Sequence, residues 1–310
     1  MKKGVLPLIT VTPAQNLQEI FDCARPGDVL SLTKGDFRGK LILRTPGVTL
    51  RGAGAGRTRI LWDDYAEKLD GKGVAYNTFR TWTMAVTADR VTMEDLSIVN
   101  DALHPETKGQ EVALTVYGDG FHMNRCRLSS TQDTLFLGPL PGDLIERYKD
   151  FLPNELRQDR PCVQRFTDCR IEGTVDFIFG CGEAVFDDCE IRSLYEARGT
   201  GYAAAPAHSK EQTAGFRFRG CRFTAGEGVP DGSVFLARPW RDYGLCIFEN
   251  CTYGPHISPL GFDKWNDTHR DRTARFYENP PVAGRVPWVQ KWTDSLPDSA
   301  VCTIKHIFSC

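Results

Sequence analysis

The segment FTDCRI, residues 166–171, recurs with variations at other places in the chain. Each copy has Met or Phe, then a polar pair, then Cys or Leu, and an apolar residue two positions after it. The pattern is an internal repeat, which is typical of stacked architectures. The other copies are MEDLSI (93–98), MNRCRL (123–128), FDDCEI (186–191), FRGCRF (218–223) and FENCTY (248–253).

The spacing within each copy predicts two short strands that meet at a corner. Residues two apart in a strand share a face, so the central Cys and the apolar residue after it lie together, while the Met or Phe three positions earlier is out of phase. The corner must therefore lie at the polar pair. Between 20 residues (Cys169 to Cys189) and 43 residues (Cys126 to Cys169) separate neighbouring copies, and no amphipathic helix intervenes. We predict an all-β fold, a parallel β-helix built as a single-stranded solenoid, with the cysteines in an interior ladder.

Length and composition agree with one large core. The chain has 310 residues, of which 41% are apolar and 25% charged. We expect a single domain over residues 1–310. The formal net charge of −2 provides no basic field, so we expect no nucleic-acid partner. No apolar stretch approaches the roughly 20 residues of a membrane span. We therefore expect no membrane partner, and we take a monomer as the default oligomeric state.

Three segments depart from the repeat. The segment 138–161 has Pro139, Pro141 and Pro153 around the charged stretch DLIERYKDF, which predicts a long loop with one short helix. Near the N-terminus, NLQEIFDC (16–23) has helical spacing and is expected to cap the first coil. The region after Gly254 is expected to pack along the side of the solenoid.

The cysteines favour a reducing compartment. There are 11, an odd number, and they show neither CxxC pairs nor zinc-type Cys/His spacing, so we expect no disulfide framework and no structural metal. The apolar run from Val5 to Ile9 contains Pro7 and is too short for a signal peptide. We expect a cytoplasmic protein, with secretion as the alternative.

The glycine-rich segment RGAGAGRT (51–58) does not fit a nucleotide site. It lacks the third glycine of the dinucleotide fingerprint and the lysine of a phosphate-binding loop, and no amphipathic helix follows it. We predict a tight turn between the first coils.

Two aspartates and an arginine occupy strand-like segments. In GTVDFIFG (173–180), alternation places Phe177 and Phe179 on one face and Asp176 with Ile178 on the other, outward face. In SSTQDTLF (129–136), Asp133 follows a polar run. In LARPW (236–240), alternation puts the Arg and Trp on one face. Each residue alone is equally compatible with an ordinary surface or loop-capping role.

Together, these segments resemble the pectin methylesterase family. The motifs GQEVAL (109–114), STQDTL (130–135), GTVDFIFG and ARPW (237–240) follow the family's order, and weaker similarity extends the resemblance to roughly residues 5–292. It implies a right-handed parallel β-helix that hydrolyses methyl esters of galacturonate units in pectin or imported pectic oligosaccharides. Methanol is released, and no metal or other cofactor takes part.

The resemblance also implies catalytic roles for five residues. Asp176 is the nucleophile, Asp133 is the general acid and base, and Arg238 orients Asp176. Gln110 and Gln132 stabilise the oxyanion. These residue types suit the reaction, because a carboxylate attacks an ester well only when its orientation is fixed, and a guanidinium fixes it through two hydrogen bonds.

Substrate contacts and departures from the family follow from the same resemblance. Asp133 and Asp176 are 43 residues apart, whereas the family separates them by about one coil, and the surplus is the insertion at about 138–161. We hypothesise that this insertion overhangs the site, closes one end of the groove and favours short methylated oligogalacturonides over polymer. Cys181 stands where the family commonly has asparagine, and it has no mechanistic explanation. The implied substrate-binding residues are Thr78, Gln110, Phe179, Arg238 and Trp240.

Three other functions compete. A pectate lyase or polygalacturonase on the same solenoid needs a calcium-binding acidic cluster or carboxylates that flank a glycosidic bond, and the four motifs argue against both. A related β-helix esterase that acts on a different acyl ester remains open. A non-catalytic carbohydrate-binding β-helix is disfavoured because all five catalytic positions are occupied by the expected residues.

Overall fold

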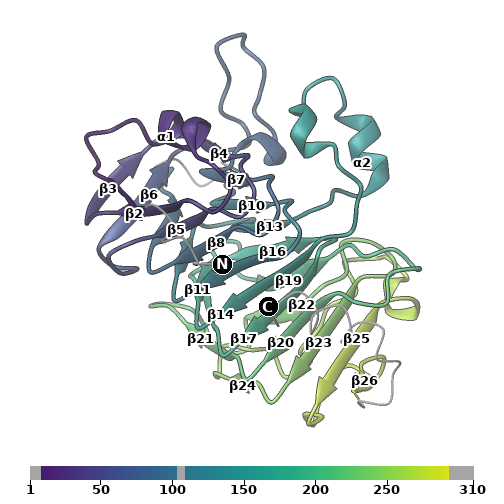
Figure 1. The fold of residues 1–310 in the computed structure, drawn as a ribbon. Coiled ribbons are helices and arrows are strands. Elements are labelled where there is room, and N and C mark those ends of the chain that lie inside the picture. The colour runs from purple at the N-terminus through teal and green to yellow at the C-terminus, as the bar shows by residue number, and fades with distance from the viewer. Residues whose placement is uncertain (1–7, 103–108, 293–310) are drawn as a thin grey trace, which may run out of the picture.

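The computed structural model describes residues 8–102 and 109–292 and shows a solenoid of three parallel sheets (Figure 1). Each full coil contributes one strand to the first sheet, one to the second and one to the third, so strands that are neighbours in a sheet come from successive coils. The chain therefore forms the predicted right-handed parallel β-helix.

The strands are short, as the repeat predicts. The first sheet contains β1 (Leu8–Val11), β2 (Val29–Leu32), β5 (Thr49–Arg51), β8 (Thr92–Glu94), β11 (Phe121–Asn124), β14 (Val163–Thr167), β17 (Glu183–Asp187), β20 (Phe216–Arg219), β23 (Leu245–Glu249), β25 (Arg275–Asn279) and β26 (Gln290–Lys291). The second contains β3 (Gly35–Arg38), β6 (Thr58–Trp62), β9 (Ser97–Asn100), β12 (Arg127–Ser129), β15 (Arg170–Gly173), β18 (Glu190–Ser193), β21 (Arg222–Ala225) and β24 (Thr252–Tyr253). The third contains β4 (Leu41–Leu43), β7 (Met84–Val86), β10 (Leu114–Val116), β13 (Leu135–Leu137), β16 (Val175–Gly180), β19 (Gly201–Pro206) and β22 (Val234–Ala237).

The corner between the first and second sheets lies at the polar pair, as predicted. The second residue of the pair has a left-handed backbone, a conformation that Asp, Asn and Gly adopt most readily. Because a left-handed backbone recurs at this position in every copy, each coil turns at the same place. The φ angles are 56° at Asp95, 51° at Arg125, 49° at Asp168, 53° at Asp188, 62° at Gly220 and 51° at Asn250.

Aromatic rings stack along the interior of the first sheet. Phe166, Phe186, Phe218 and Phe248 pair in register on successive strands. Their ring centroids are 4.9, 4.7 and 4.9 Å apart, with interplanar angles of 15° or less. The repeat thus places one large apolar side chain of each coil on top of the next.

The cysteine ladder also lies in the interior. Cys126, Cys169, Cys189 and Cys221 are buried, and Cys251 near the C-terminal end is half-buried. All nine cysteines of the described segments are free thiols. The remaining two cysteines, at positions 302 and 310, lie outside the described residues.

The N-terminal cap and the glycine-rich turn form as predicted. Helix α1 (Leu17–Cys23) begins after Asn16, whose Oδ1 accepts a hydrogen bond from the Gln18 backbone N–H at 3.0 Å. The segment 51–58 turns between β5 and β6. A side chain at Gly52 would meet the Asp95 carbonyl oxygen at 2.3 Å, so the close approach of two coils requires glycine there.

The C-terminal region differs from the prediction. Strand β25 pairs in parallel with β23, so residues after Gly254 extend the first sheet as well as lying beside the solenoid. The Cys-containing frame is not repeated after Cys251, so β25 and β26 cannot be recognised from it in the sequence.

Two segments project from the solenoid next to the third sheet (Figure 1). The first projection, residues 63–81, links β6 to β7 and ends in the short helix η1 (Thr78–Arg80). The second projection, the inserted segment 138–161, links β13 to β14 and contains α2 (Gly142–Arg147) and η2 (Asn154–Leu156). The rings of Phe79 and Tyr148 connect the two projections at a centroid distance of 5.6 Å.

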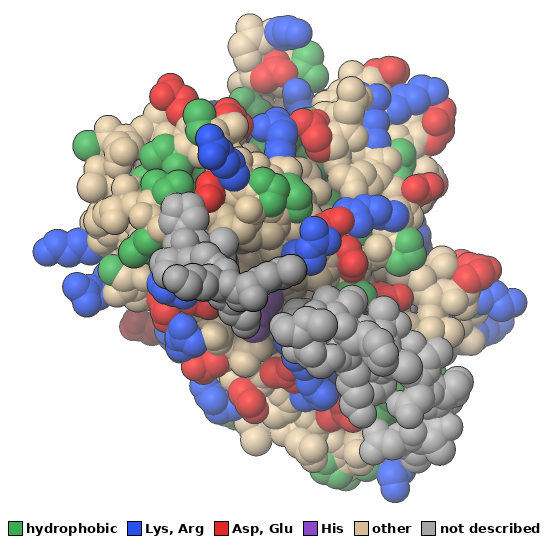
Figure 2. Space-filling view, viewed as in Figure 1, with side chains coloured by type: hydrophobic (Ala, Val, Ile, Leu, Met, Phe, Trp, Pro, Cys, Tyr) green, Lys and Arg blue, Asp and Glu red, His purple; other side chains and the backbone are tan. Residues whose placement is uncertain are grey.

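The surface carries both charges. On the face drawn in Figure 2, outside the grey residues, acidic and basic side chains are interspersed without an extended region of one sign. Neither α-helix of the described segments has the length and hydropathy of a membrane span.

Candidate active site

One cavity of about 460 Å³ above the third sheet gathers every site residue that the sequence predicts. We call it the reaction cavity. Its lining comes from both projections and from five successive coils, so the stacking of coils brings together residues as far apart in the sequence as Asn77 and Trp265. The predicted residues that line it are Thr78, Gln110, Gln132, Asp133, Asp176, Phe179, Arg238 and Trp240.

The two aspartates occupy equivalent positions on neighbouring coils. Leu135 pairs with Ile178 in the third sheet, and Asp133 and Asp176 each lie two residues earlier. Both aspartates have left-handed backbones, with φ of 65° and 50°. The Asp133 N–H donates to the Val175 carbonyl at 3.0 Å, which ties the two coils together at this point. Such backbone strain concentrates at functional sites.

A bulge in β16 overturns the alternation predicted for GTVDFIFG. The pairing of β16 with β19 shifts register between Val175 and Ile178. Phe177 and Ile178 consequently both pack in the main core, and Phe179 turns into the reaction cavity. Strict alternation predicted Phe179 inside and Ile178 outside. This prediction was wrong, because a bulge advances the pleat by one residue. Asp176 lines the cavity but is only 6% exposed.

Arg238 holds Asp176 through two hydrogen bonds. Its Nε donates to Oδ1 at 2.8 Å and its Nη2 donates to Oδ2 at 2.7 Å. The guanidinium itself lies between two rings, 3.8 Å from the centroid of Tyr202 and 4.0 Å from that of Trp265. Stacking and bidentate pairing together fix the orientation of the Asp176 carboxylate.

The two carboxyl groups have different electrostatic surroundings. Burial raises the pKa of Asp133 well above its usual range, and the charge of Asp176 adds to this effect. Burial also raises the pKa of Asp176, but the hydrogen bonds and charge of Arg238 act in the opposite direction. The first proton therefore comes off Asp176, which leaves a carboxylate at Asp176 beside a protonated Asp133.

Gln132 is positioned by a surface arginine. Its Oε1 accepts a hydrogen bond from Nη2 of Arg198 at 3.0 Å, and its side chain is hydrogen-bonded to Asp133. Glu196 holds Arg198 through contacts of 2.7 and 3.0 Å. Gln110 reaches the same cavity from the loop before β10. Two side-chain amides thus border the space next to the aspartates.

An aromatic wall completes the cavity. The ring of Trp240 lies 5.8 Å from Phe179 and 6.4 Å from Phe79, and the Arg241 guanidinium lies 4.9 Å from the Trp240 centroid. Rings of this kind provide flat apolar surfaces for a ligand, while the buried carboxyl groups provide the polar contacts.

Several residues of the site were not predicted from the sequence. Tyr202 and Trp265 stack on Arg238, Arg198 binds Gln132, and Arg147 and Tyr148 line the cavity from the inserted segment. Their positions depend on loop paths that the repeat does not encode. The only sequence feature that could have pointed to any of them was the charged and aromatic composition of DLIERYKDF, which contains Arg147 and Tyr148.

The described residues contain no group of three or more His, Cys, Asp or Glu side chains arranged to hold a metal ion. What the site contains is an oriented carboxylate, a protonated carboxyl group and two amides. This combination suits nucleophilic acyl transfer, with the amides available for the negative charge that develops on a carbonyl oxygen.

Comparison with protein families agrees with this arrangement. The family model described as Pectinesterase matches residues 12–139 and 155–291. The residues between the two matched parts, 140–154, fall within the inserted segment.

Curated relatives include plant pectinesterases. Pectinesterase QRT1 of Arabidopsis thaliana is 30% identical, and the alignment covers 77% of this chain and 58% of that protein. Pectinesterase 31 of Arabidopsis thaliana is 27% identical, with coverage of 90% and 82%. The chain thus spans between 58% and 82% of the lengths of these two relatives.

Solved structures share the fold. The pectin methylesterase from Yersinia enterocolitica has a TM-score of 0.77 and 25% identity, with 96% of this chain and all of that chain covered. The pectin methylesterase from carrot has a TM-score of 0.78 and 23% identity, with coverage of 95% and 91%. A pectin methylesterase in complex with a hexasaccharide has a TM-score of 0.77 and 23% identity, with 94% of both chains covered.

Proposed function

Because the chain belongs to the pectinesterase family, we propose that it is a carboxylic ester hydrolase that removes methyl esters from galacturonate units of pectin or pectic oligosaccharides and releases methanol. The observation that carries this proposal is the bidentate pairing of Arg238 with Asp176 beside the buried Asp133.

In the first half of the reaction, the Asp176 carboxylate attacks the ester carbonyl carbon. A new C–O bond forms and the carbonyl oxygen becomes an oxyanion, which N–H groups of Gln110 and Gln132 stabilise by about 2.7 to 4 kcal/mol per donor. The bond to the methoxy oxygen then breaks. Asp133 gives its proton to that oxygen, so methanol leaves, Asp133 becomes a carboxylate and the substrate acyl group remains on Asp176.

In the second half, water cleaves the acyl group from Asp176. The Asp133 carboxylate takes a proton from water as the water oxygen attacks the acyl carbon. The bond to the Asp176 oxygen breaks, which restores the Asp176 carboxylate and the protonated Asp133, and the galacturonic acid product leaves. Throughout, Arg238 keeps Asp176 within attack geometry.

The competing function, hydrolysis of a different ester, is tested by comparing the hydrolysis of methyl esters with that of acetyl esters. We expect the purified protein to release methanol from methylated oligogalacturonides and to leave acetyl esters of the same oligosaccharides intact. Matched substrates that differ only in the ester make the comparison direct. Faster release of acetate than of methanol would assign the site to a different ester.

The organisation of the chain is part of the proposal. We propose one domain over residues 1–310 with the insertion at about 138–161, supported by one hydrophobic cluster that includes residues from Val11 to Phe276. We further propose that the protein acts as a monomer, without a metal, nucleic-acid or membrane partner. The mixed charges of the face in Figure 2 support the absence of a nucleic-acid partner.

The cellular location is proposed to be the cytoplasm, with secretion as the alternative. The nine free thiols of the described segments support a reducing compartment. Intact protein in the culture supernatant, in the absence of lysis markers, would contradict this location.

A further inference from the structure

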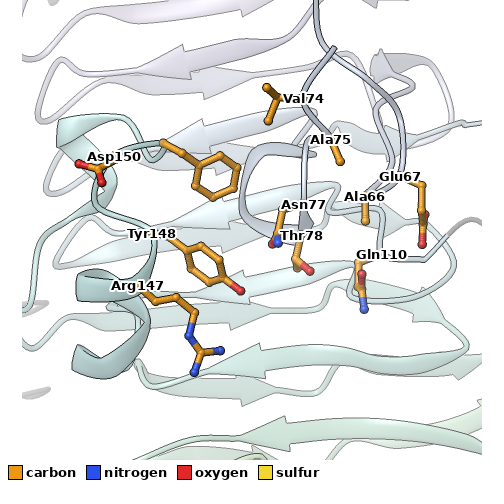
Figure 3. A pocket seen from close by; sticks show the side chains of 11 residues that line it. Ala66, Glu67, Val74, Ala75, Asn77, Thr78, Gln110, Arg147, Tyr148 and Asp150 are labelled. Atoms are coloured by element: carbon orange, nitrogen blue, oxygen red, sulfur yellow. The ribbon is translucent and has the colours of Figure 1, made fainter. Parts of the chain in front are cut away.

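A second cavity of about 610 Å³ adjoins the reaction cavity (Figure 3). We call it the outer cavity. The first projection lines one side with residues that include Ala66, Val74 and Ala75, and the inserted segment lines the other. Its volume is within the range of small-molecule sites. Thr78 and Gln110 border both cavities, so a ligand chain can extend from one into the other.

The inserted segment contributes residues that the family model does not cover. Arg147, Tyr148, Asp150 and Phe151 all line the outer cavity and all fall within the unmatched residues 140–154. This side of the cavity therefore consists of residues that the family model does not match. Arg147 and Tyr148 also line the reaction cavity, so they stand where the two cavities meet.

Arg147 is available for a ligand, unlike the other arginines of the reaction cavity. Arg238 is bound to Asp176, and Arg241 is bound to Asp143 at 3.0 Å. No carboxylate of the described residues lies within ion-pair distance of Arg147, and its side chain is exposed. A guanidinium without a protein partner presents a planar pair of donors that matches a carboxylate.

The arrangement in the outer cavity favours a sugar acid next to Arg147. Two acidic side chains line the outer cavity: Figure 3 shows Glu67 on the side opposite Arg147, and Asp150 further along the inserted segment, beyond Tyr148. A carboxylate beside Arg147 is therefore kept away from both. Figure 3 shows the Tyr148 ring next to Arg147, and the Phe151 ring lies 5.4 Å from the Tyr148 ring, centroid to centroid. These rings supply an apolar surface for a pyranose ring, and the guanidinium supplies charge recognition.

We propose that the outer cavity is a subsite for a further unit of the substrate, and that Arg147 binds the free carboxylate of an unesterified galacturonate there. This inference rests on the proposed function. The enzyme thereby prefers methyl esters that are close to a unit already de-esterified, and Arg147 determines this specificity without taking part in the chemistry.

The kinetic test compares two oligogalacturonides of equal length, one fully methylated and one partly de-esterified. Arg147→Gln is expected to lower the ratio of kcat/KM for the partly de-esterified substrate to kcat/KM for the fully methylated substrate about tenfold. Arg57→Gln, at an exposed arginine that borders neither cavity, is the matched control and should change neither value. An equal loss on both substrates, or no loss on either, would overturn the proposal.

A binding test separates this proposal from the proposed function. A fully de-esterified oligogalacturonide has no ester to hydrolyse, so calorimetry can measure its Kd for the wild-type protein directly. Arg147→Gln is expected to raise this Kd about tenfold. Absence of methanol release by the wild-type protein would refute the proposed function, whereas equal Kd values for wild type, Arg147→Gln and Arg57→Gln would refute the role of Arg147.

Discussion

At the scale of single residues, Asp133 links catalysis to stability. Burial, followed by the charge of Asp176, raises the pKa of its carboxyl well above the usual range. In the unfolded chain this carboxyl has an ordinary pKa of about 4. Protonated Asp133 therefore makes its full contribution to the free energy of unfolding below about pH 4. This contribution is lost progressively as the pH rises towards the pKa that Asp133 has in the folded state.

Asp133→Asn is expected to abolish activity and to stabilise the fold at neutral pH. The amide stays neutral, and asparagine tolerates the φ of 65° at this position. Urea unfolding should show a gain of about 1 to 2 kcal/mol near pH 7 and almost none near pH 4. A variant less stable than wild type at pH 7 would show that the buried carboxyl does not destabilise the protein.

Arg198 is expected to act through Gln132 and through the two aspartates. Arg198→Gln should lower kcat about tenfold with a smaller change in KM, because the hydrogen bond to Gln132 Oε1 is lost. The charge of Arg198 also lowers the pKa of Asp133 and that of Asp176. Removing this charge should raise both pKa values and shift both limbs of the pH–rate profile to higher pH.

The matched control for this variant is Arg222→Gln, at an exposed arginine of the second sheet that is remote from both cavities. It should leave kcat and the pH profile unchanged. If Arg198→Gln lowered kcat without moving the profile, the electrostatic part of its role would be excluded.

At the scale of elements, the phenylalanine stack of the first sheet should dominate stability. Phe218 is fully buried between Phe186 and Phe248. Phe218→Ala is expected to cost about 3 to 5 kcal/mol in the free energy of unfolding. Leu69→Ala, at a side chain that is 63% exposed in the first projection, should change it by less than about 0.5 kcal/mol. If Phe218→Ala lowered the free energy of unfolding by less than about 1 kcal/mol, the neighbouring rings would have to move in and fill the cavity that the substitution leaves.

The elements that repeat were predictable from the sequence, and the irregular ones were not. The corner at Asp168 and the ladder position of Cys169 follow from local spacing, because a strand alternates and a left-handed corner favours Asp or Asn. The inward placement of Phe179 was wrong because a bulge is invisible in an alternating pattern. Arg198 and Trp265 reach the site through loops whose paths depend on packing between coils.

The site itself was predicted as a set of motifs. The structure brings its residues together because the strands of the third sheet stack: Asp133 precedes β13, Asp176 lies in β16 and Arg238 follows β22.

At the scale of the whole molecule, the two projections border both the reaction cavity and the outer cavity. Arg80 of the first projection lies over the Phe151 ring of the second at 4.4 Å, and Arg44 binds Glu155 at 2.9 Å. These contacts fix the inserted segment against the N-terminal coils. This position supports the hypothesis that the segment limits the groove at one end.

Replacing residues 142–151 with a short glycine-serine linker is expected to shift the substrate preference towards polymer. The ratio of kcat/KM for long pectin to kcat/KM for short methylated oligogalacturonides should rise about tenfold, because an obstacle at one end of the groove excludes a continuous chain. A stability measurement accompanies the assay, since Leu144 is buried. An unchanged ratio in a folded variant would contradict the hypothesis.

The central claim is that Asp176, oriented by Arg238, is the nucleophile of a metal-free methyl ester hydrolysis. The most direct test measures methanol release from methylated oligogalacturonides by the wild-type protein and by Asp176→Asn, each with a chelator present. We predict sustained release by wild type and a loss of about 10³-fold or more in the variant. No methanol from the wild-type protein, chelator-sensitive release, or substantial activity in Asp176→Asn would contradict the claim.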